Sequence, residues 1–202
     1  MAIDDFHGKY FFLSNFYNSP IWYKGKLWPT VEHAFQAAKV DDDTANKILV
    51  AKTPGDAKRL GRQGKMCPNW DTYRITVMRE CLQRKFLCND ELLKQLLDTG
   101  DEELIEGTTW HDNFWGNCTC PKCANITGEN MLGKLLMEIR DKARRGMYVW
   151  GVWTTVDEYS GNIHHLFKER KDAEAWLSKN YDWYCTTPCV PDDIHLKIIE
   201  LK

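Results

Sequence analysis

Residues 31–40 place three polar side chains that could do chemistry beside a core-facing stripe. Glu32, Gln36 and Lys39 follow the i, i+4, i+7 spacing of one helical face. Apolar residues at helical spacing form a neighbouring stripe: Val31, Ala34, Phe35 and Ala38. An acid, an amide and an amine are therefore expected side by side next to the core. An ordinary amphipathic helix with a solvated polar face would show the same pattern.

The start of this helix is marked by Thr30, whose hydroxyl suits the N-cap position. Glu32 then falls in the first turn, where the helix dipole favours a carboxylate. His33 points about 100° away from the Glu32 stripe, so we expect it to be structural.

Length and composition limit the classes of protein. The chain has 202 residues, 43% of them hydrophobic, and a net charge of −2, so it has material for a real core but no broad basic surface for nucleic acid. Nine Trp, eight Tyr and eight Phe suit a site for a base or a sugar. There is no long apolar stretch and the N-terminus does not read as a secretion signal, so we expect a cytoplasmic protein with eight reduced cysteines and no membrane contact.

Capping and turn signals predict a mainly α-helical first part, residues 1–145, with short N-terminal strands. Residues 6–28 read as extended segments and turns, with a hairpin around Gly25. Residues 101–129 read mostly as loop, which in a compact domain is usually functional or disordered, and their Trp, Cys and Gly content argues against disorder. Helices are expected at about 31–40, 44–51, 53 to 61–64, 71–88, 89–100 and 130–145.

The composition changes at Gly146. Residues 148–156 are rich in β-formers, 163–167 can pair with them across a turn, 171–179 read as a helix, and 195–201 alternate like a strand. Residues 146–202 are therefore predicted to be a small α+β (ββαβ) accessory module. About 55 residues make a marginal core, so we expect the module to pack on the first domain or on a protein partner.

Four segments with polar residues next to turn or helix signals form an ordered set. They are Leu13-Ser14-Asn15-Phe16, residues 32–39, Leu60-Gly61-Arg62, and residues 112–116 together with 130–133. With Thr53-Pro54, Lys85-Phe86, Thr99-Gly100 and residues 135–140, this set resembles the YbiA-like family, also called NADAR, over roughly residues 6–145. The resemblance implies a mostly α-helical domain that hydrolyses a ribose N-glycosidic bond. It implies substrates such as ADP-ribosylated guanine or early phosphorylated intermediates of riboflavin synthesis.

Cleavage of a C–N bond at an anomeric carbon needs a carboxylate near the sugar and a proton donor near the base. Glu32 and Asp112 are the acids expected to do this, with Glu106 in reserve. Lys39 could orient a phosphate, or attack C1 of a ring-opened ribose as a Schiff base if burial lowers its pKa. We favour the imine because it fits the resemblance.

The expected substrate-binding residues are Asn15, Gln36, Arg62, Trp115 and Asn130. Arg62, Lys39 and helix N-termini could hold a phosphate, and Trp115 could stack on a flat ligand. The alternatives are structural: Asn15 and Arg62 would fasten loops, Trp115 would be core, and Asp112 would be a turn or cap residue.

Cys118, Cys120 and Cys123 form a cluster with the spacing of a zinc knuckle. A complete site needs a fourth ligand, for which His111 is nearest and Cys67 or Cys88 are alternatives. Because there is no second CxxC pair, we expect free thiols and no cofactor, with structural zinc as the alternative.

The resemblance, together with these residues, thus implies an N-glycosidase acting on a small-molecule or nucleic-acid-attached ribosyl substrate. A protein that binds ADP-ribose or a related nucleotide without turning it over is the alternative of another class. A zinc-knuckle nucleic-acid adaptor is disfavoured by the net charge of −2.

Overall fold

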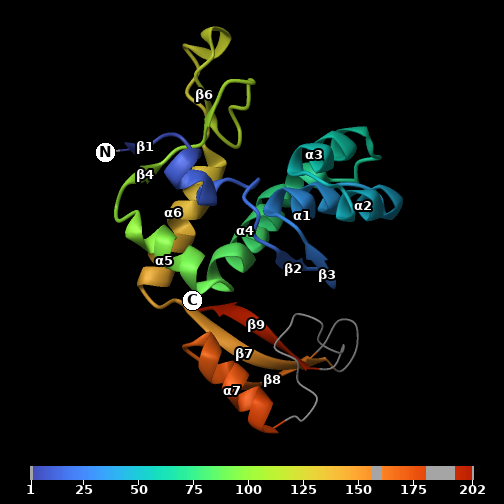
Figure 1. Cartoon of the computed structure of the whole chain (residues 1–202), viewed down its shortest axis with the longest axis vertical. Coiled ribbons are helices and arrows are strands. Elements are labelled where there is room, and N and C mark those ends of the chain that lie inside the picture. Colours follow the sequence, from blue (N-terminus) through green and yellow to red (C-terminus); the bar gives the residue numbers. More distant parts are fainter. Residues whose placement is uncertain (1, 156–160, 181–193, 202) are drawn as a thin grey trace. The chain divides into compact units, whose positions relative to one another are not determined.

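The computed structural model describes residues 2–155, 161–180 and 194–201. The chain folds into two compact units, Met1–Arg140 and Asp141–Lys202. The first unit is mainly α-helical, as predicted (Figure 1). Among the described residues, no helix has both the length and the apolarity needed to cross a bilayer.

The first unit begins with strand β1 (Ala2–Ile3), the 3-10 helix η1 (Gly8–Leu13) and a hairpin of β2 (Ile21–Tyr23) and β3 (Lys26–Trp28). The hairpin predicted around Gly25 is confirmed, with positive φ at Lys24 and Gly25, as a tight two-residue turn requires. The extended structure predicted for residues 8–13 is wrong. A 3-10 turn buries Phe12, whose ring meets that of Phe86 edge-on at 6.5 Å, and this tertiary contact outweighs the β-forming composition.

The helices lie close to the predicted ranges, since their N-terminal caps are local signals. Thr30, Thr53 and Asn89 each accept a hydrogen bond from the backbone N–H three residues later. The helices that follow these caps are α1 (Val31–Ala38), α3 (Pro54–Gln63) and α5 (Asp90–Asp98). The side chain of Asp41 caps α2 (Asp42–Leu49), whereas α4 (Trp70–Leu87) begins without a side-chain cap bond.

The core of the first unit forms where α1 packs on α2, α3 and α4, and where α6 (Met131–Arg144) adds its apolar stripe (Figure 1). Fully buried side chains come from segments far apart in the sequence, among them Leu13, Ile48, Met78, Leu82, Leu104, Leu132 and Leu136. This packing places α1 between α3 and α4, so its polar stripe faces neighbours rather than water.

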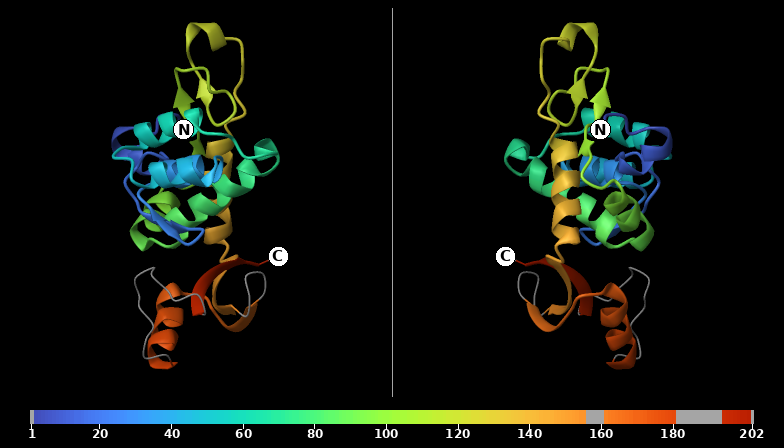
Figure 2. Two further views of the ribbon diagram at one scale, coloured as in Figure 1. Left: turned by 90° about the vertical axis from the view of Figure 1, so that its right-hand side faces the viewer. Right: turned by 90° about the vertical axis from the view of Figure 1, so that its left-hand side faces the viewer.

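The segment predicted mostly as loop contains three two-residue strands: β4 (Glu103–Leu104), β5 (Gly107–Thr108) and β6 (Asn117–Cys118). Strand β4 pairs with β1 and β5 pairs with β6, both in parallel. Beyond the β5–β6 pair the loop extends away from the helices of this unit (Figure 2).

In the second unit the described elements are β7 (Tyr148–Thr155), β8 (Gly161–Phe167), α7 (Arg170–Asn180) and β9 (Ile194–Glu200). The strands form an antiparallel sheet in the order β8-β7-β9, with a register shift between Val152 and Trp153. Ala173 and Leu177 of α7 are buried, as the helical spacing predicts.

Candidate functional site

The polar stripe of α1 is buried rather than solvated. Glu32 is only 5% exposed and Gln36 only 6%. The Nε2 group of Gln36 donates a hydrogen bond of 2.8 Å to Glu32 Oε1, one helical turn away. Thr30 caps this helix end, so the Glu32 carboxyl lies in the first turn, where the dipole favours negative charge.

Glu32 experiences two opposing influences. Burial is the larger, and it raises the pKa of the Glu32 carboxyl. The cation of Lys58 is the strongest influence in the other direction, followed by the hydrogen bond from Gln36. Lys39 and Arg62 add smaller effects of the same sign. A buried carboxyl among three cations is therefore the centre of this site, which we call the Glu32 cluster: Glu32, Gln36, Lys39, Lys58, Arg62 and Glu106.

Helix α3 contributes two of the cations. Lys58 and Arg62 are one turn apart, each next in sequence to a buried residue of α3, Ala57 or Gly61; Lys58 is half-buried and Arg62 is exposed. Gly61 allows the close approach, because a Cβ atom there would lie 2.2 Å from Gln36 Oε1. Sequence reasoning found Arg62 but missed Lys58, although the spacing Lys58-x-x-Gly61-Arg62 is a usable signal.

Lys39 follows the last residue of α1 and is half-buried. Burial lowers the pKa of its amine, and the nearby cations of Arg62 and Lys58 lower it further. The negative charge of Glu32 acts in the opposite direction. Partial desolvation favours the neutral, nucleophilic form of a lysine, which is the condition that the imine hypothesis set for this residue.

Glu106 supplies a second carboxyl. Burial raises its pKa to about 7, and the charges of Asp112 and Glu32 add to that increase while Lys58 opposes it. Asn130 positions this residue, because its Oδ1 accepts a hydrogen bond from the Glu106 backbone N–H at 3.1 Å. The Asn130 Nδ2 group donates to the Leu104 carbonyl at 2.8 Å. These contacts hold the backbone of the loop, and a contact of Asn130 with substrate stays a prediction.

Asp112 lies close enough to Glu106 to affect its pKa, but one of its oxygens is occupied. Its Oδ1 accepts hydrogen bonds from the backbone N–H groups of Phe114 and Trp115, at 3.2 and 2.9 Å. The structure therefore gives Asp112 the turn-forming role that was the alternative interpretation, and a catalytic role stays a prediction. The Trp115 ring packs edge-on against Phe35 of α1 at 5.3 Å, and its partial exposure leaves the predicted stacking untested.

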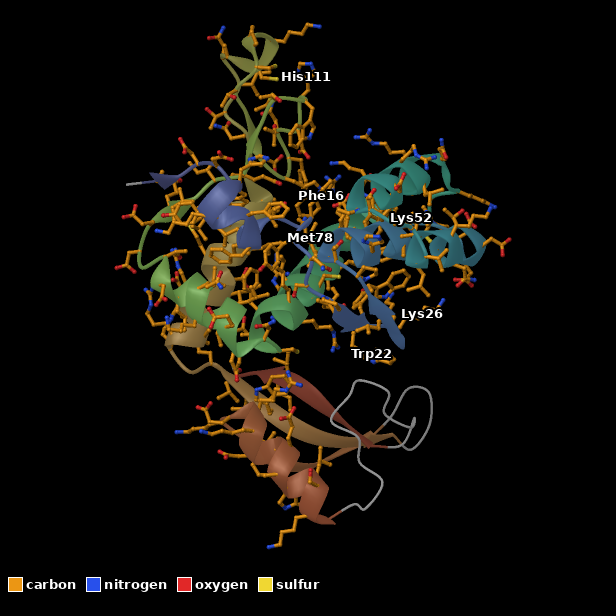
Figure 3. All side chains as sticks on the ribbon, viewed as in Figure 1. Phe16, Trp22, Lys26, Lys52, Met78 and His111 are labelled. Carbon is orange, nitrogen blue, oxygen red and sulfur yellow. The ribbon has the colours of Figure 1, made fainter. Side chains whose placement is uncertain are left out.

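The segment of Asn15 lies against α1. The Asn15 carbonyl accepts a hydrogen bond from the Glu32 backbone N–H at 3.1 Å, and its Nδ2 group donates to Met78 Sδ at 3.5 Å. Figure 3 labels Met78 and the adjacent Phe16 in this region. Two buried oxygens, Asn15 Oδ1 and Gln36 Oε1, have no hydrogen-bond partner within residues 2–155, 161–180 and 194–201. Gln36 Oε1 lies against Gly61 of α3, where a Cβ atom would be only 2.2 Å away.

Two aromatic rings border the cluster. The Nζ group of Lys58 lies 5.7 Å from the centre of the Phe16 ring and 5.5 Å from that of Trp110. Trp110 is 51% exposed, which is unusual for so large an apolar group. Sequence reasoning did not single out Trp110 as a site residue, because an isolated tryptophan in a loop carries no positional signal.

The predicted cysteines also come together. Cys118, Cys120 and Cys123 form a group with His111, whereas the other candidate fourth ligands, Cys67 and Cys88, lie outside it. A separate cavity of about 660 Å³ is lined by residues of η1, α5 and the turn after α5. None of the Glu32 cluster lines that cavity, so it is distinct from the candidate active site.

The fold and the site define a mainly helical domain that surrounds a buried acid with cations. A model of the NADAR domain family matches residues 4–144, and the chain belongs to this family. The solved NMR structure of the Escherichia coli protein YbiA matches with a TM-score of 0.61 and 35% identity, covering 72% of this chain and 88% of that one.

Curated relatives are consistent with this assignment. An N-glycosidase of Nostoc punctiforme is 37% identical over 146 residues, which are 69% of this chain and 90% of that protein. The N-glycosidase YbiA of E. coli is 39% identical over 132 residues, 64% of this chain and 79% of that protein. A riboflavin biosynthesis protein of Vibrio vulnificus is 40% identical over 142 residues, 69% of this chain but 36% of that longer protein. Together the two N-glycosidases support an N-glycosidase activity for this chain.

Proposed function

We propose that this N-glycosidase hydrolyses the bond between a phosphorylated ribose and a planar nitrogenous base, with ADP-ribosylated guanine as the leading substrate. The observation that carries the proposal is the buried Glu32 carboxyl, hydrogen-bonded to Gln36 and approached by Lys39, Lys58 and Arg62. A carboxylate suits the positive charge that develops on the sugar, and the cations suit the phosphate groups attached to it.

A second carboxyl would serve the leaving base. With a pKa of about 7, the Glu106 carboxyl is partly protonated at neutral pH and can donate a proton to the departing nitrogen. In this scheme the C–N bond breaks, its electron pair stays on the base nitrogen, and water adds to C1 of the ribose. Glu32 stabilises the charge on the sugar, while Phe16 and Trp110 offer faces on which the base could stack.

Lys39 supports a variant of this scheme. Its partly desolvated amine could add to C1 of a ring-opened ribose, so that the base leaves and an imine to Lys39 forms. Water would then hydrolyse the imine, releasing the sugar and restoring the amine. We favour this route because phosphate binding needs only a charged lysine, whereas the lowered pKa of Lys39 favours the neutral amine that a nucleophile needs.

A riboflavin-pathway intermediate is the second candidate substrate. The observation in its favour is the name of the V. vulnificus relative, a riboflavin biosynthesis protein that aligns with this chain over 142 residues. Such an intermediate also carries a phosphorylated ribose on a nitrogenous ring, so the same cations and carboxyls would serve it.

The test is a panel of ribosylated substrates, free and attached to nucleic acid, with base release followed by mass spectrometry. Glu32→Gln should lower turnover by about 10²–10⁴-fold, because the change keeps the shape of the side chain and removes its charge. Glu91→Gln is the matched control: Glu91 also accepts from a glutamine four residues later, but on the exposed side of α5. Tight ligand binding without any base release would instead identify a nucleotide-binding module.

We further propose that residues 146–202 are an accessory module with a protein partner, and that the reaction takes place in the cytoplasm. None of the six cysteines of the described residues forms a disulfide, which favours a reducing compartment.

A further inference from the structure

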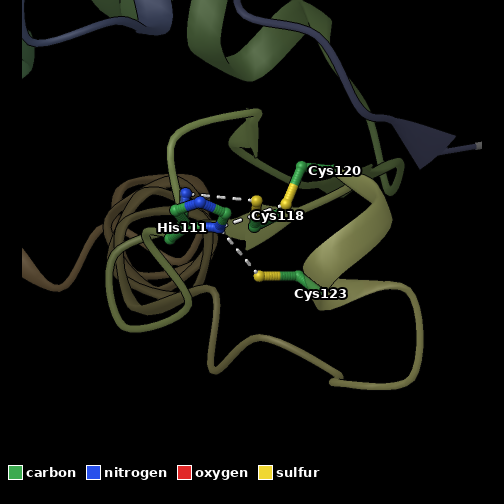
Figure 4. Close-up of side chains that lie close together, drawn as sticks. All are labelled: His111, Cys118, Cys120 and Cys123. Atoms are coloured by element: carbon green, nitrogen blue, oxygen red, sulfur yellow. Dashed lines mark hydrogen bonds between the residues drawn. The ribbon is translucent and has the colours of Figure 1, made fainter.

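Four potential metal ligands converge in the loop around β6 (Figure 4). The Nδ1 atom of His111 lies 3.1 Å from Cys120 Sγ and 3.4 Å from Cys123 Sγ. The backbone N–H of His111 donates to Cys118 Sγ at 3.3 Å. All four ligand atoms lie within 4.8 Å of one another.

These distances suit a tetrahedral zinc site. With one nitrogen and three sulfurs, Zn–S bonds of about 2.3 Å and Zn–N bonds of about 2.0–2.1 Å place neighbouring ligand atoms roughly 3.5–3.8 Å apart. Small shifts of the side chains would therefore bring one nitrogen and three sulfurs around a single ion. Three thiolates and an imidazole select zinc over the hard cations Mg²⁺ and Ca²⁺.

The burial of the loop gives an independent reason for a metal. Trp115 packs on Phe35, but from residue 116 to residue 129 the buried residues are Gly116, Cys118 and Cys123, so no aliphatic or aromatic side chain forms a core in that part of the loop. The strands β5 and β6 contribute only a two-residue pair. His111 also holds a φ of 65°, a left-handed conformation that costs energy for a residue other than glycine. Something other than apolar packing has to hold this segment, and a metal does so in small domains that lack a core.

We propose that His111, Cys118, Cys120 and Cys123 bind one structural Zn²⁺ ion. Four protein ligands leave no open position, so the ion does not take part in the reaction. The ion ties His111 to the opposite arm of the loop. Trp110 directly precedes His111 in the chain, and Asp112 directly follows it. The ion thereby holds in place the segment that meets Lys58 and Glu106 in the Glu32 cluster. This positioning role rests on the proposed function, whereas the metal site itself does not.

The first experiment measures metal in the full chain, purified without chelator from cells supplied with zinc. We expect close to one Zn per chain, and near zero in Cys118→Ser and Cys123→Ser. Cys67→Ser is the matched control, because Cys67 lies outside the group and donates to the Val40 carbonyl, a bond that serine can keep. Zinc well below one equivalent in the unaltered chain, or iron in its place, would overturn the proposal.

The second experiment uses the unaltered chain, so it does not depend on variants that fold. Replacement of the ion by Co²⁺ should produce thiolate-to-metal charge transfer and the intense visible bands of tetrahedral coordination. Removal of the ion should speed hydrogen–deuterium exchange in residues 107–123 and leave α1 unchanged. Octahedral cobalt without charge transfer, or unaltered exchange in the loop, would contradict a Cys₃His site. Neither readout involves base release, so failure here is distinct from failure of the proposed function.

Discussion

Gly61→Ala tests whether the contact between α3 and α1 builds the Glu32 cluster. The added Cβ would lie 2.2 Å from Gln36 Oε1 and 3.0 Å from Gln36 Cβ. Either Gln36 rotates and its hydrogen bond to Glu32 breaks, at about 1.5–3 kcal/mol, or the helices separate, at about 1–3 kcal/mol. Alanine recovers up to about 1 kcal/mol through its helix propensity. We expect a net loss of about 1–2 kcal/mol, hence a Tm lower by roughly 2–8 °C.

The matched control is Gly55→Ala in the same helix, where the new Cβ would find its nearest neighbour, Thr53 Oγ1, at an ordinary 3.7 Å. This variant should be as stable as the unaltered chain or slightly more so. Thermal unfolding by circular dichroism gives the stabilities, and base release gives the activities. Gly61→Ala should also lose turnover, because Lys58 and Arg62 move with α3 away from Glu32. If Gly61→Ala melted and turned over like Gly55→Ala, the close approach would have no role in the site.

The remaining predictions concern titration, covalent trapping and truncation. Because the Glu106 carboxyl must be protonated to donate, turnover should fall as pH rises through about 7. If Glu106→Gln showed the same fall, Glu106 would not be the proton donor. Borohydride added during turnover should attach the sugar to Lys39, as intact-mass analysis would show; no adduct together with an active Lys39→Arg variant would leave Lys39 as a positioning group. Burial lowers the pKa of Lys85 to about 7, and its Nζ donates to the Ser14 carbonyl. Between pH 7 and 9 the unfolded chain therefore binds more protons at Lys85 than the folded chain does, and the free energy of unfolding should rise with pH by up to about 2 kcal/mol. Denaturant titration should show this rise in the unaltered chain and not in Lys85→Met. A chain truncated after Arg145 should keep its helical circular dichroism and measurable base release; a folded but inactive product would show that the second unit contributes to catalysis.

The sequence by itself determined the features that depend on neighbours along the chain. Thr30, Thr53 and Asn89 mark the starts of helices, because an N-cap hydrogen bond joins residues only three positions apart. The hairpin turn at Gly25 and the adjacency of Glu32 and Gln36 follow from equally local geometry. The family resemblance followed from short motifs that occur in a fixed order along the chain. Recognising such motifs needs no knowledge of tertiary contacts.

Only the tertiary structure decided which polar residues meet and in what environment. A stripe such as Glu32 and Gln36 looks alike whether solvated or buried, and the packing of α3 on α1 made it buried and brought Lys58 beside it. Likewise η1 depends on the contact of Phe12 with Phe86. His111 joins Cys118 and Cys123 only because the loop folds back through the β5–β6 pair. Burial, pKa and ligand geometry arise from contacts between segments distant in sequence, and no local pattern encodes those distances.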